Sequence, residues 1–163
     1  MSRELITQVQ IFKDLSPAYD DLLAQLFLPY EAEAGDVLFE QGDPSDNFYV
    51  LVSGEVAIRY KPEDGPAITI TRVRPQGVIG WSAILGSPLY TSSAACSTAC
   101  RLLRVRSSDL RALCAANPSV GVLLLDRLAG LIAQRLHQTR TQVMNLLKEG
   151  MNVRLQTISA STA

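Results

Sequence analysis

Histidine and cysteine are scarce in this chain, which has one histidine and three cysteines among 163 residues. A zinc-type metal site needs several such ligands close together, so the single His137 cannot build a multi-histidine centre. Cys96, Cys100 and Cys114 are odd in number and contain no C-x-x-C pair, which argues against redox or metal chemistry. We therefore predict no metal, and we interpret Cys96 and Cys100 as small buried side chains on one face of a strand.

Long hydrophobic runs are also missing. The longest, residues 120–125, ends at Asp126 and is far shorter than the roughly 20 residues that span a bilayer. The first residues do not combine a positive start with an apolar stretch, as a secretory signal would. The sequence thus predicts a cytoplasmic protein without a membrane segment, and its length is typical of one domain with a single hydrophobic core.

Positive charge is rare in the first part of the chain, and negative charge is rare in the second. Residues 1–66 carry 13 acidic and 4 basic residues (4 − 13 = −9), whereas residues 67–163 carry 11 basic and 3 acidic ones (11 − 3 = +8). The basic residues form no run, so direct nucleic-acid binding is not expected. We favour solvated strand and helix faces, with an acidic partner for the basic part as the alternative.

Motifs of catalysis are absent as well. The sequence contains no Gly-x-Ser-x-Gly elbow, no phosphate-binding P-loop and no histidine–cysteine pairing of a hydrolase type. A cupin-type metalloenzyme, which is built on a β-barrel, would also require more than one histidine. These absences predict a protein that is not an enzyme.

The patterns that are present predict a β-rich domain. Residues 30–106 contain short apolar segments separated by turn signals, and the segments 48–52, 56–60 and 67–71 are rich in β-branched and aromatic residues. Short strands at such regular spacing are typical of an antiparallel barrel or jelly roll. We therefore expect a mainly β fold in which helices flank the barrel.

Helices are expected on both sides of the barrel. Ser16 and Pro17 mark a helix start, with serine as the N-cap and proline at the first position, and Pro29 is expected to close this helix. The N-terminal helices thus occupy about residues 1–29. Two C-terminal helices are predicted within residues 108–148, with a break at Asn117-Pro118. Residues 1–150 then form the domain, and residues 151–163 form a short tail.

The last predicted helix carries two apolar stripes. One alternates spacings of four and three residues, a 3.5-residue period typical of helices that pair with another helix; its members are Leu125, Ala129, Ile132, Leu136, Thr139, Val143 and Leu146. A second stripe, Leu124, Leu128 and Leu131, could pack on the protein's own barrel. We therefore predict a homodimer whose interface is the first stripe.

The stretch AGDVLFEQGDPSDNFYVLVSGEV at residues 34–56 strongly resembles the opening of the cyclic-nucleotide-binding domain. Such domains occur in catabolite-activator-type regulators, protein kinase A regulatory subunits and gated channels. Gly35, Gly42 and Gly54 lie where tight turns need a positive φ. The resemblance extends over about residues 8–148. It implies an antiparallel jelly-roll β-barrel (a double-stranded β-helix) with an N-terminal helix and two C-terminal helices, the last of them long and engaged in a parallel homodimer.

The same resemblance implies a ligand loop over residues 80–94. In the family, backbone N–H groups of a short helix and an arginine bind the cyclic phosphate, and a glutamate holds the ribose. Here Trp81 stands at the glutamate position and Tyr90 at the arginine position. Loss of a charge-assisted contact worth about 1.5–3 kcal/mol predicts binding that is about tenfold to hundredfold weaker. The candidate ligand-binding residues of the loop are Gly80, Trp81, Ser82, Ala83, Tyr90, Thr91 and Ser92.

Three interpretations of this loop remain open. It could bind cyclic AMP or cyclic GMP tightly, bind an altered ligand through aromatic stacking and hydroxyl groups, or be plugged by its aromatic residues. On the long helix, Thr139 falls at a position where the family has a hydroxyl that contacts adenine, and Arg140 replaces a second hydroxyl. Arg140 could supply the charge lost at position 90, whereas Thr139 could simply be a small residue tolerated in a dimer interface.

Few residues follow the predicted long helix. A catabolite-activator-type regulator would continue into a helix-turn-helix domain, and the 15 residues after Lys148 (163 − 148 = 15) are too few for one. We expect a non-catalytic regulatory module that binds an altered or weakly bound small ligand and signals through a dimer helix to a separate output protein. The alternatives are the sensor part of a Crp/Fnr-type transcriptional regulator, lacking or separated from its DNA-binding domain, and a dimerisation scaffold with a non-functional pocket.

Overall fold

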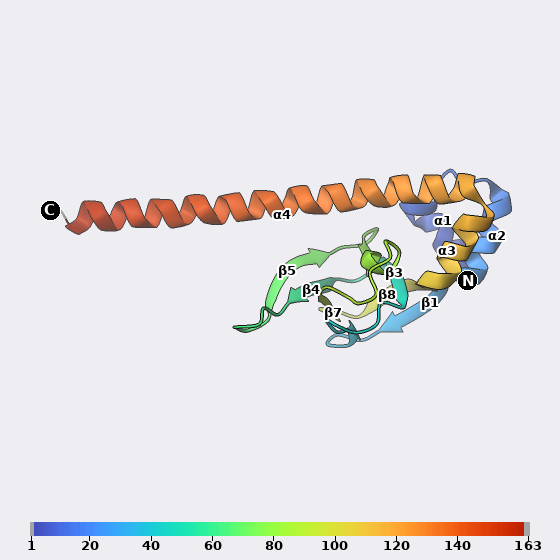
Figure 1. Ribbon diagram of the computed structural model, residues 1–163, viewed down its shortest axis with the longest axis horizontal. Coiled ribbons are helices and arrows are strands. Elements are labelled where there is room, and N and C mark those ends of the chain that lie inside the picture. The colour runs from blue at the N-terminus through green and yellow to red at the C-terminus, as the bar shows by residue number, and fades with distance from the viewer. Residues whose placement is uncertain (1, 162–163) are drawn as a thin grey trace. The chain divides into compact units, whose positions relative to one another are not determined.

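Two four-stranded antiparallel sheets face each other in the computed structural model of the protein, which describes residues 2–161 (Figure 1). The first sheet has the order β1-β8-β3-β6 and the second the order β2-β7-β4-β5. This pairing confirms the predicted jelly roll. The strands are β1 (Leu28–Ala32), β2 (Val37–Phe39), β3 (Asn47–Ser53), β4 (Val56–Tyr60), β5 (Ile68–Val73), β6 (Val78–Ile79), β7 (Ser93–Cys96) and β8 (Cys100–Arg106).

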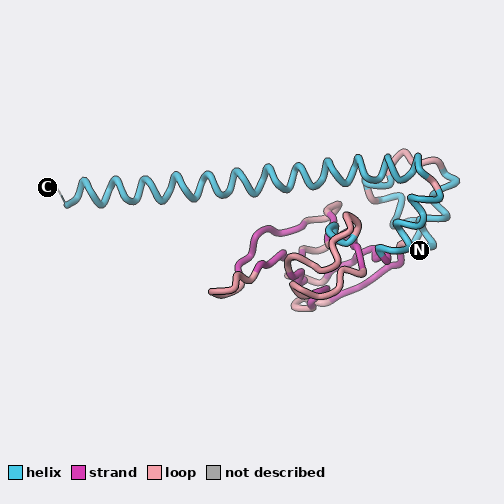
Figure 2. The backbone as a smooth tube through the Cα atoms, viewed as in Figure 1, coloured by secondary structure: helices cyan, strands magenta, loops and turns pink. Residues whose placement is uncertain are grey.

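Helices precede and follow the barrel. They are α1 (Ser2–Gln8), a 3-10 turn η1 (Gln10–Phe12), α2 (Pro17–Leu26), α3 (Ser107–Ala116) and α4 (Pro118–Ser161), and a second 3-10 turn, η2 (Trp81–Ala83), lies within the barrel sequence. By packing, the chain divides into two units, residues 1–128 and residues 129–163. In the first unit, α1, α2 and α3 gather at one end of the strands (Figure 2).

The central strand β3 is buried on both of its faces, which explains its run of apolar residues. Tyr49 and Leu51 point into the space between the sheets and belong to the main core cluster. Phe48 and Val50 lie on the opposite face, where Phe48 meets the ring of Phe27, the residue after α2, at a centroid distance of 6.5 Å. The first sheet therefore separates two apolar layers, one inside the barrel and one beneath the helices.

The predicted strands are confirmed, with small changes at the barrel entry. Pro17 is the first residue of α2, as expected, but the side chain of Ser16 makes no capping hydrogen bond. Pro29 does not close a helix, because α2 ends at Leu26 and Pro29 lies inside β1. An edge strand tolerates proline, since one side of its backbone has no strand to pair with, and β1 is the edge of its sheet.

The prediction that the long helix ends near Lys148 is wrong. The break before Pro118 is present, but α4 continues to Ser161 through most of the expected tail; residues 162–163 lie outside the described part. No proline interrupts this stretch, and Gly150 costs a helix only about 1 kcal/mol relative to alanine. The part of α4 that belongs to the second unit, residues 129–161, is thus about 50 Å long at 1.5 Å per residue.

The two apolar stripes of α4 differ in burial. Leu124 and Leu128 are buried within the first unit, in agreement with the predicted intramolecular stripe, and Leu131 is half-buried. Most of the predicted dimer stripe is open in the single chain, with Leu125, Leu136 and Leu146 exposed by 46, 64 and 67%. Eight large apolar side chains among residues 129–161 are 48–67% exposed: Leu136, Val143, Met144, Leu146, Leu147, Met151, Leu155 and Ile158.

The placement of two cysteines also differs from the prediction. Cys96 ends β7 and Cys100 begins β8, so they lie on strands of different sheets and not on one face of one strand. Both side chains are buried and free, and Cys114 is half-buried in α3. In the described part of the chain, no cluster of three or more metal-ligating side chains occurs. Among residues 2–161, no helix combines the length and hydrophobicity needed to cross a bilayer.

Gly54 closes the hairpin between β3 and β4 in a conformation that other residues avoid. Its φ is +98°, and a Cβ atom placed there would lie 2.5 Å from the carbonyl oxygen of Ala99 and 2.7 Å from Sγ of Cys100. Gly35 has a similar φ of +93°, but a Cβ atom there would meet nothing within 4 Å. The two glycines therefore separate backbone strain from steric overlap.

We predict that Gly54→Ala lowers the free energy of unfolding by about 2–4 kcal/mol, because left-handed strain and overlap with Ala99 act together. Gly35→Ala should cost about 1–2 kcal/mol, from backbone strain alone. Urea denaturation of both variants measures the difference. Equal losses in the two proteins would contradict the close contact at Gly54.

Candidate functional site

The loop that follows β6, which is the predicted ligand loop, begins with a left-handed glycine and a short 3-10 turn. Gly80 adopts a left-handed conformation with φ +76° and turns the chain into η2. A Cβ atom at this position would lie 2.8 Å from the carbonyl oxygen of Asn47. Glycine is therefore required here, because both the backbone angle and the close approach to β3 exclude a side chain.

Backbone hydrogen bonds tie the end of the loop to the turn between β2 and β3. The amide of Gly42 donates to the carbonyl oxygen of Tyr90, and the amide of Tyr90 donates to Asp43, both at 2.9 Å. The amide of Ser45 donates to the carbonyl oxygen of Pro88 at 3.1 Å. The position of residue 90 is thus fixed by main-chain contacts and does not depend on its side chain.

The side chain of Tyr90 is part of the barrel interior. Its ring stacks on Phe39 with a centroid distance of 3.6 Å and an interplanar angle of 10°, and the residue is only 4% exposed. The hydroxyl group donates to the carbonyl oxygen of Asn47 at 2.6 Å and accepts from the Asn47 amide at 3.0 Å. Burial raises the pKa of Tyr90, so the phenol stays neutral and keeps its donor at physiological pH.

The other predicted loop residues are more accessible. Trp81, Ser82 and Ser92 are half-buried, Thr91 is exposed and Ala83 is buried in the core. The hydroxyl groups of Ser82, Thr91 and Ser92 form no hydrogen bond with any residue that the structure describes. These three hydroxyls are therefore uncommitted, in contrast to the hydroxyl of Tyr90.

Arg104 is a cation on the interior face of the barrel that no sequence motif marks. It pairs in register with Tyr49 across β3 and β8, and it places its guanidinium 4.8 Å from the ring centre of Tyr30. Burial raises the pKa of Tyr49 to about 12, with a smaller contribution from Tyr90, and Arg104 opposes the rise. The alternation of side chains along a strand could have predicted the interior position of Arg104 from the sequence, because Cys100, Leu102 and Arg104 share one face of β8.

The two candidates on the long helix belong to the second unit. Thr139 is half-buried, and its hydroxyl donates to the carbonyl oxygen of Arg135 at 3.0 Å. Arg140 is exposed. Their assignment to a ligand site therefore stays a prediction. The structure does bring Ala83 and Tyr90 together in the core cluster of the barrel, whereas it gives Trp81 no side-chain contact with either of them among the described residues.

Comparison with known proteins shows which proteins this chain is similar to. A model of the cyclic nucleotide-binding domain matches residues 30–117. Over 144 residues, the chain is 26% identical to a CRP-like cAMP-activated global transcriptional regulator of Mycobacterium tuberculosis (strain ATCC 25618 / H37Rv), covering 88% of this chain and 62% of that protein. The chain thus spans about three fifths of the length of this curated relative.

The structure of this chain is also similar to solved structures. A protein from Geobacter metallireducens GS-15 assigned to cyclic nucleotide binding has a TM-score of 0.74 and 25% identity, over 84% of this chain and 99% of that one. The catabolite activator protein of Thermus thermophilus has a TM-score of 0.66 and 26% identity, over 83% of this chain and 62% of that one. Since the family model matches more than half of the sequence, residues 30–117, the chain belongs to the cyclic nucleotide-binding domain family.

Proposed function

We propose that this chain is a non-catalytic regulatory module that binds an altered or weakly bound small ligand and signals through a homodimer of α4. The ligand would be a cyclic nucleotide or a related polar molecule. The observation that carries this proposal is the orientation of Tyr90, whose side chain is committed to Phe39 and Asn47 inside the barrel. Tyr90 has no charge and no free hydroxyl, and it stands where the family resemblance implies a phosphate-binding arginine.

Electrostatics argue for weak binding of an ordinary cyclic nucleotide. A phosphate that leaves water needs a charge-assisted partner to offset its desolvation. Tyr90 cannot supply one, because it stays neutral and its only donor already faces the carbonyl oxygen of Asn47. Trp81, at the position that would hold the ribose, offers one indole donor and no acceptor.

Other groups around the loop support an altered ligand. Ser82, Thr91 and Ser92 offer hydroxyls that no described residue uses. Arg104 provides a positive charge on the interior face of the barrel, and it forms no ion pair within residues 2–161. A ligand that combines hydroxyl contacts with a modest negative charge would suit this set better than one that depends on a bidentate arginine.

Two other functions have specific support. A dimerisation scaffold with a plugged pocket is supported by the close stacking of Phe39 and Tyr90, which fills the barrel interior. The sensor part of a Crp/Fnr-type transcriptional regulator is supported by the similarity to the Mycobacterium tuberculosis regulator, whose sequence is covered only to 62%. In each case the output would be provided by a further domain or a separate protein.

A ligand screen tests the main proposal. We expect at least one cyclic mononucleotide or cyclic dinucleotide to raise the melting temperature, since a ligand at 100 times its dissociation constant adds about 2.7 kcal/mol. Arg104→Ala should reduce this shift. Arg101→Ala, an exposed arginine on the other face of the same strand, is the matched control and should not. No shift with any ligand in differential scanning fluorimetry would favour the scaffold.

A double substitution tests whether the loop frame still accepts a cyclic nucleotide. Trp81→Glu with Tyr90→Arg should bind cyclic AMP at least tenfold more tightly than the original chain, because it restores a charge-assisted phosphate contact. It should also melt at a lower temperature, since the stacking on Phe39 and both Asn47 hydrogen bonds are lost. Titration calorimetry measures the affinity. Trp81→Gln with Tyr90→Met is the uncharged control, and equal affinities of the two variants would refute an intact frame.

The dimer interface is tested by charge insertion. Ile132→Glu with Leu136→Glu should convert a dimer into a monomer, because two carboxylates would be buried in an apolar interface. Gln134→Glu with Gln138→Glu adds the same charges on the other side of α4 and should leave the mass unchanged. Sedimentation equilibrium gives the mass of each protein. A dimer that persists in the Ile132/Leu136 variant would place the interface elsewhere.

A further inference from the structure

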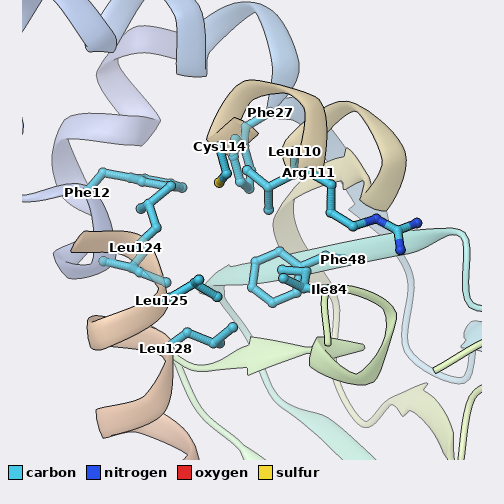
Figure 3. A pocket seen from close by; sticks show the side chains of 11 residues that line it. Phe12, Phe27, Phe48, Ile84, Leu110, Arg111, Cys114, Leu124, Leu125 and Leu128 are labelled. Carbon is cyan, nitrogen blue, oxygen red and sulfur yellow. The ribbon is translucent and has the colours of Figure 1, made fainter. Parts of the chain in front are cut away.

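An apolar cavity lies in the first unit, beneath the helices and outside the barrel interior. Its volume is about 130 Å³, and its lining is almost entirely apolar. Figure 3 shows Phe12, Phe27, Phe48, Leu124 and Leu128 directed toward the same space. These residues come from η1, β3, α4 and the position that follows α2, and Ile84 of the loop after β6 also lines the cavity. The cavity is therefore formed where the helices and this loop meet the outer face of the first sheet.

The size of this cavity limits what it could hold. An engineered apolar cavity of about 150 Å³ in another protein stays dry and binds benzene. A space of about 130 Å³ therefore suits one aromatic ring or a chain of five or six carbons. It is too small for a nucleotide base joined to a sugar, so the cavity is not a displaced version of the loop site.

One arginine joins this cavity to a polar cleft. Arg111 of α3 lines the apolar cavity and also lines a cleft of about 450 Å³ together with Arg106 and Ser108. In Figure 3 the aliphatic part of Arg111 borders the cavity while its guanidinium points away from the apolar side chains. Neither Arg111 nor Arg106 forms an ion pair with a residue in the described range 2–161.

The charge of the cleft favours a single negative group. Its lining residues include two arginines and one carboxylate, Asp46, which leaves one positive charge in excess. A monoanion such as a carboxylate neutralises this one excess charge, whereas a dianion would leave the occupied cleft with a net negative charge. The uncharged lining residues of the cleft are Ser45, Asn47, Ser107 and Ser108, so hydroxyl groups and an amide complete a polar surface.

We infer that the apolar cavity and the polar cleft together form a binding site for a small amphipathic monoanion. Its apolar body, an aromatic ring or a short acyl chain, occupies the space lined by Phe12, Phe48 and Leu124. Its carboxylate reaches the guanidinium of Arg111. This site goes beyond the proposed function, because such a ligand would use neither Tyr90 nor the hydroxyls of the loop.

Cys114 provides a direct report on occupancy. It lines the cavity and is half-buried, whereas Cys96 and Cys100 are each only 3% exposed. A small thiol reagent such as methyl methanethiosulfonate should therefore modify Cys114 first in the folded protein. A molecule bound in the cavity should slow this reaction by blocking access to the sulfur.

Three probes separate the body from the charge. Phenylacetate carries both, 2-phenylethanol carries the ring without the charge, and acetate carries the charge without the ring. We expect phenylacetate to slow the modification of Cys114 at a concentration about tenfold lower than either of the others. Equal protection by 2-phenylethanol would overturn the role of the charge, and equal protection by acetate would overturn the role of the cavity. No protection by phenylacetate at millimolar concentration would refute the site.

Two variants locate the contacts. Arg111→Ala should weaken phenylacetate about fivefold to tenfold, a modest loss because an exposed arginine is screened by water, and should leave 2-phenylethanol within twofold. Arg74→Ala, an exposed arginine in the turn after β5, is the control. Cys114→Met should fill the cavity, raise the melting temperature and remove phenylacetate binding in titration calorimetry. Unchanged binding in either Arg111→Ala or Cys114→Met would contradict the inference.

Discussion

The burial of β3 on both faces is the constraint on which the rest of the structure depends. Its inner face holds Tyr49 and Leu51 in the barrel core, and its outer face holds Phe48 under the helices. The carbonyl oxygen of Asn47, at the start of the strand, accepts a hydrogen bond from the hydroxyl of Tyr90. The same oxygen leaves no space for a Cβ atom at position 80, so this position requires glycine. One strand thus contacts both the candidate ligand loop and the apolar cavity, whose lining includes Ile84 of that loop.

At position 90, where the family resemblance implies an arginine, an aromatic ring stabilises the loop. An arginine at position 90 would need an anionic ligand to offset its desolvation, so its loop would be best ordered when occupied. Tyr90 satisfies its hydroxyl with Asn47 and its ring with Phe39 without any ligand. The loop is therefore held by contacts within the chain, and the proposed ligand would gain its affinity from other groups, such as the hydroxyls of Ser82, Thr91 and Ser92 and the charge of Arg104.

The burial of apolar residues changes along the helix α4. Leu124 and Leu128 are buried in the first unit, whereas the large apolar residues further along are about half to two thirds exposed. Exposed apolar side chains at this density along about 50 Å of helix favour association, because burying them removes apolar surface from water. In proteins, most of the stability of a helix comes from the packing of its apolar face and not from helix propensity. A second copy of the chain is the partner that the 3.5-residue spacing suits.

The sequence by itself determined the order of the elements, the jelly-roll barrel, the break at Pro118 and the positive φ of Gly35, Gly42 and Gly54, because periodicity, proline and turn glycines act over a few residues. It misplaced the end of α4, since helix ends without a clear stop signal depend on weak preferences. Only the tertiary structure decided that Tyr90 turns inward onto Phe39, that Arg104 shares a face with Tyr49, and that Arg111 joins a cavity to a cleft. These contacts join segments far apart in the chain, and the space that they fill or leave empty follows from strand register and side-chain volume, which no local pattern records.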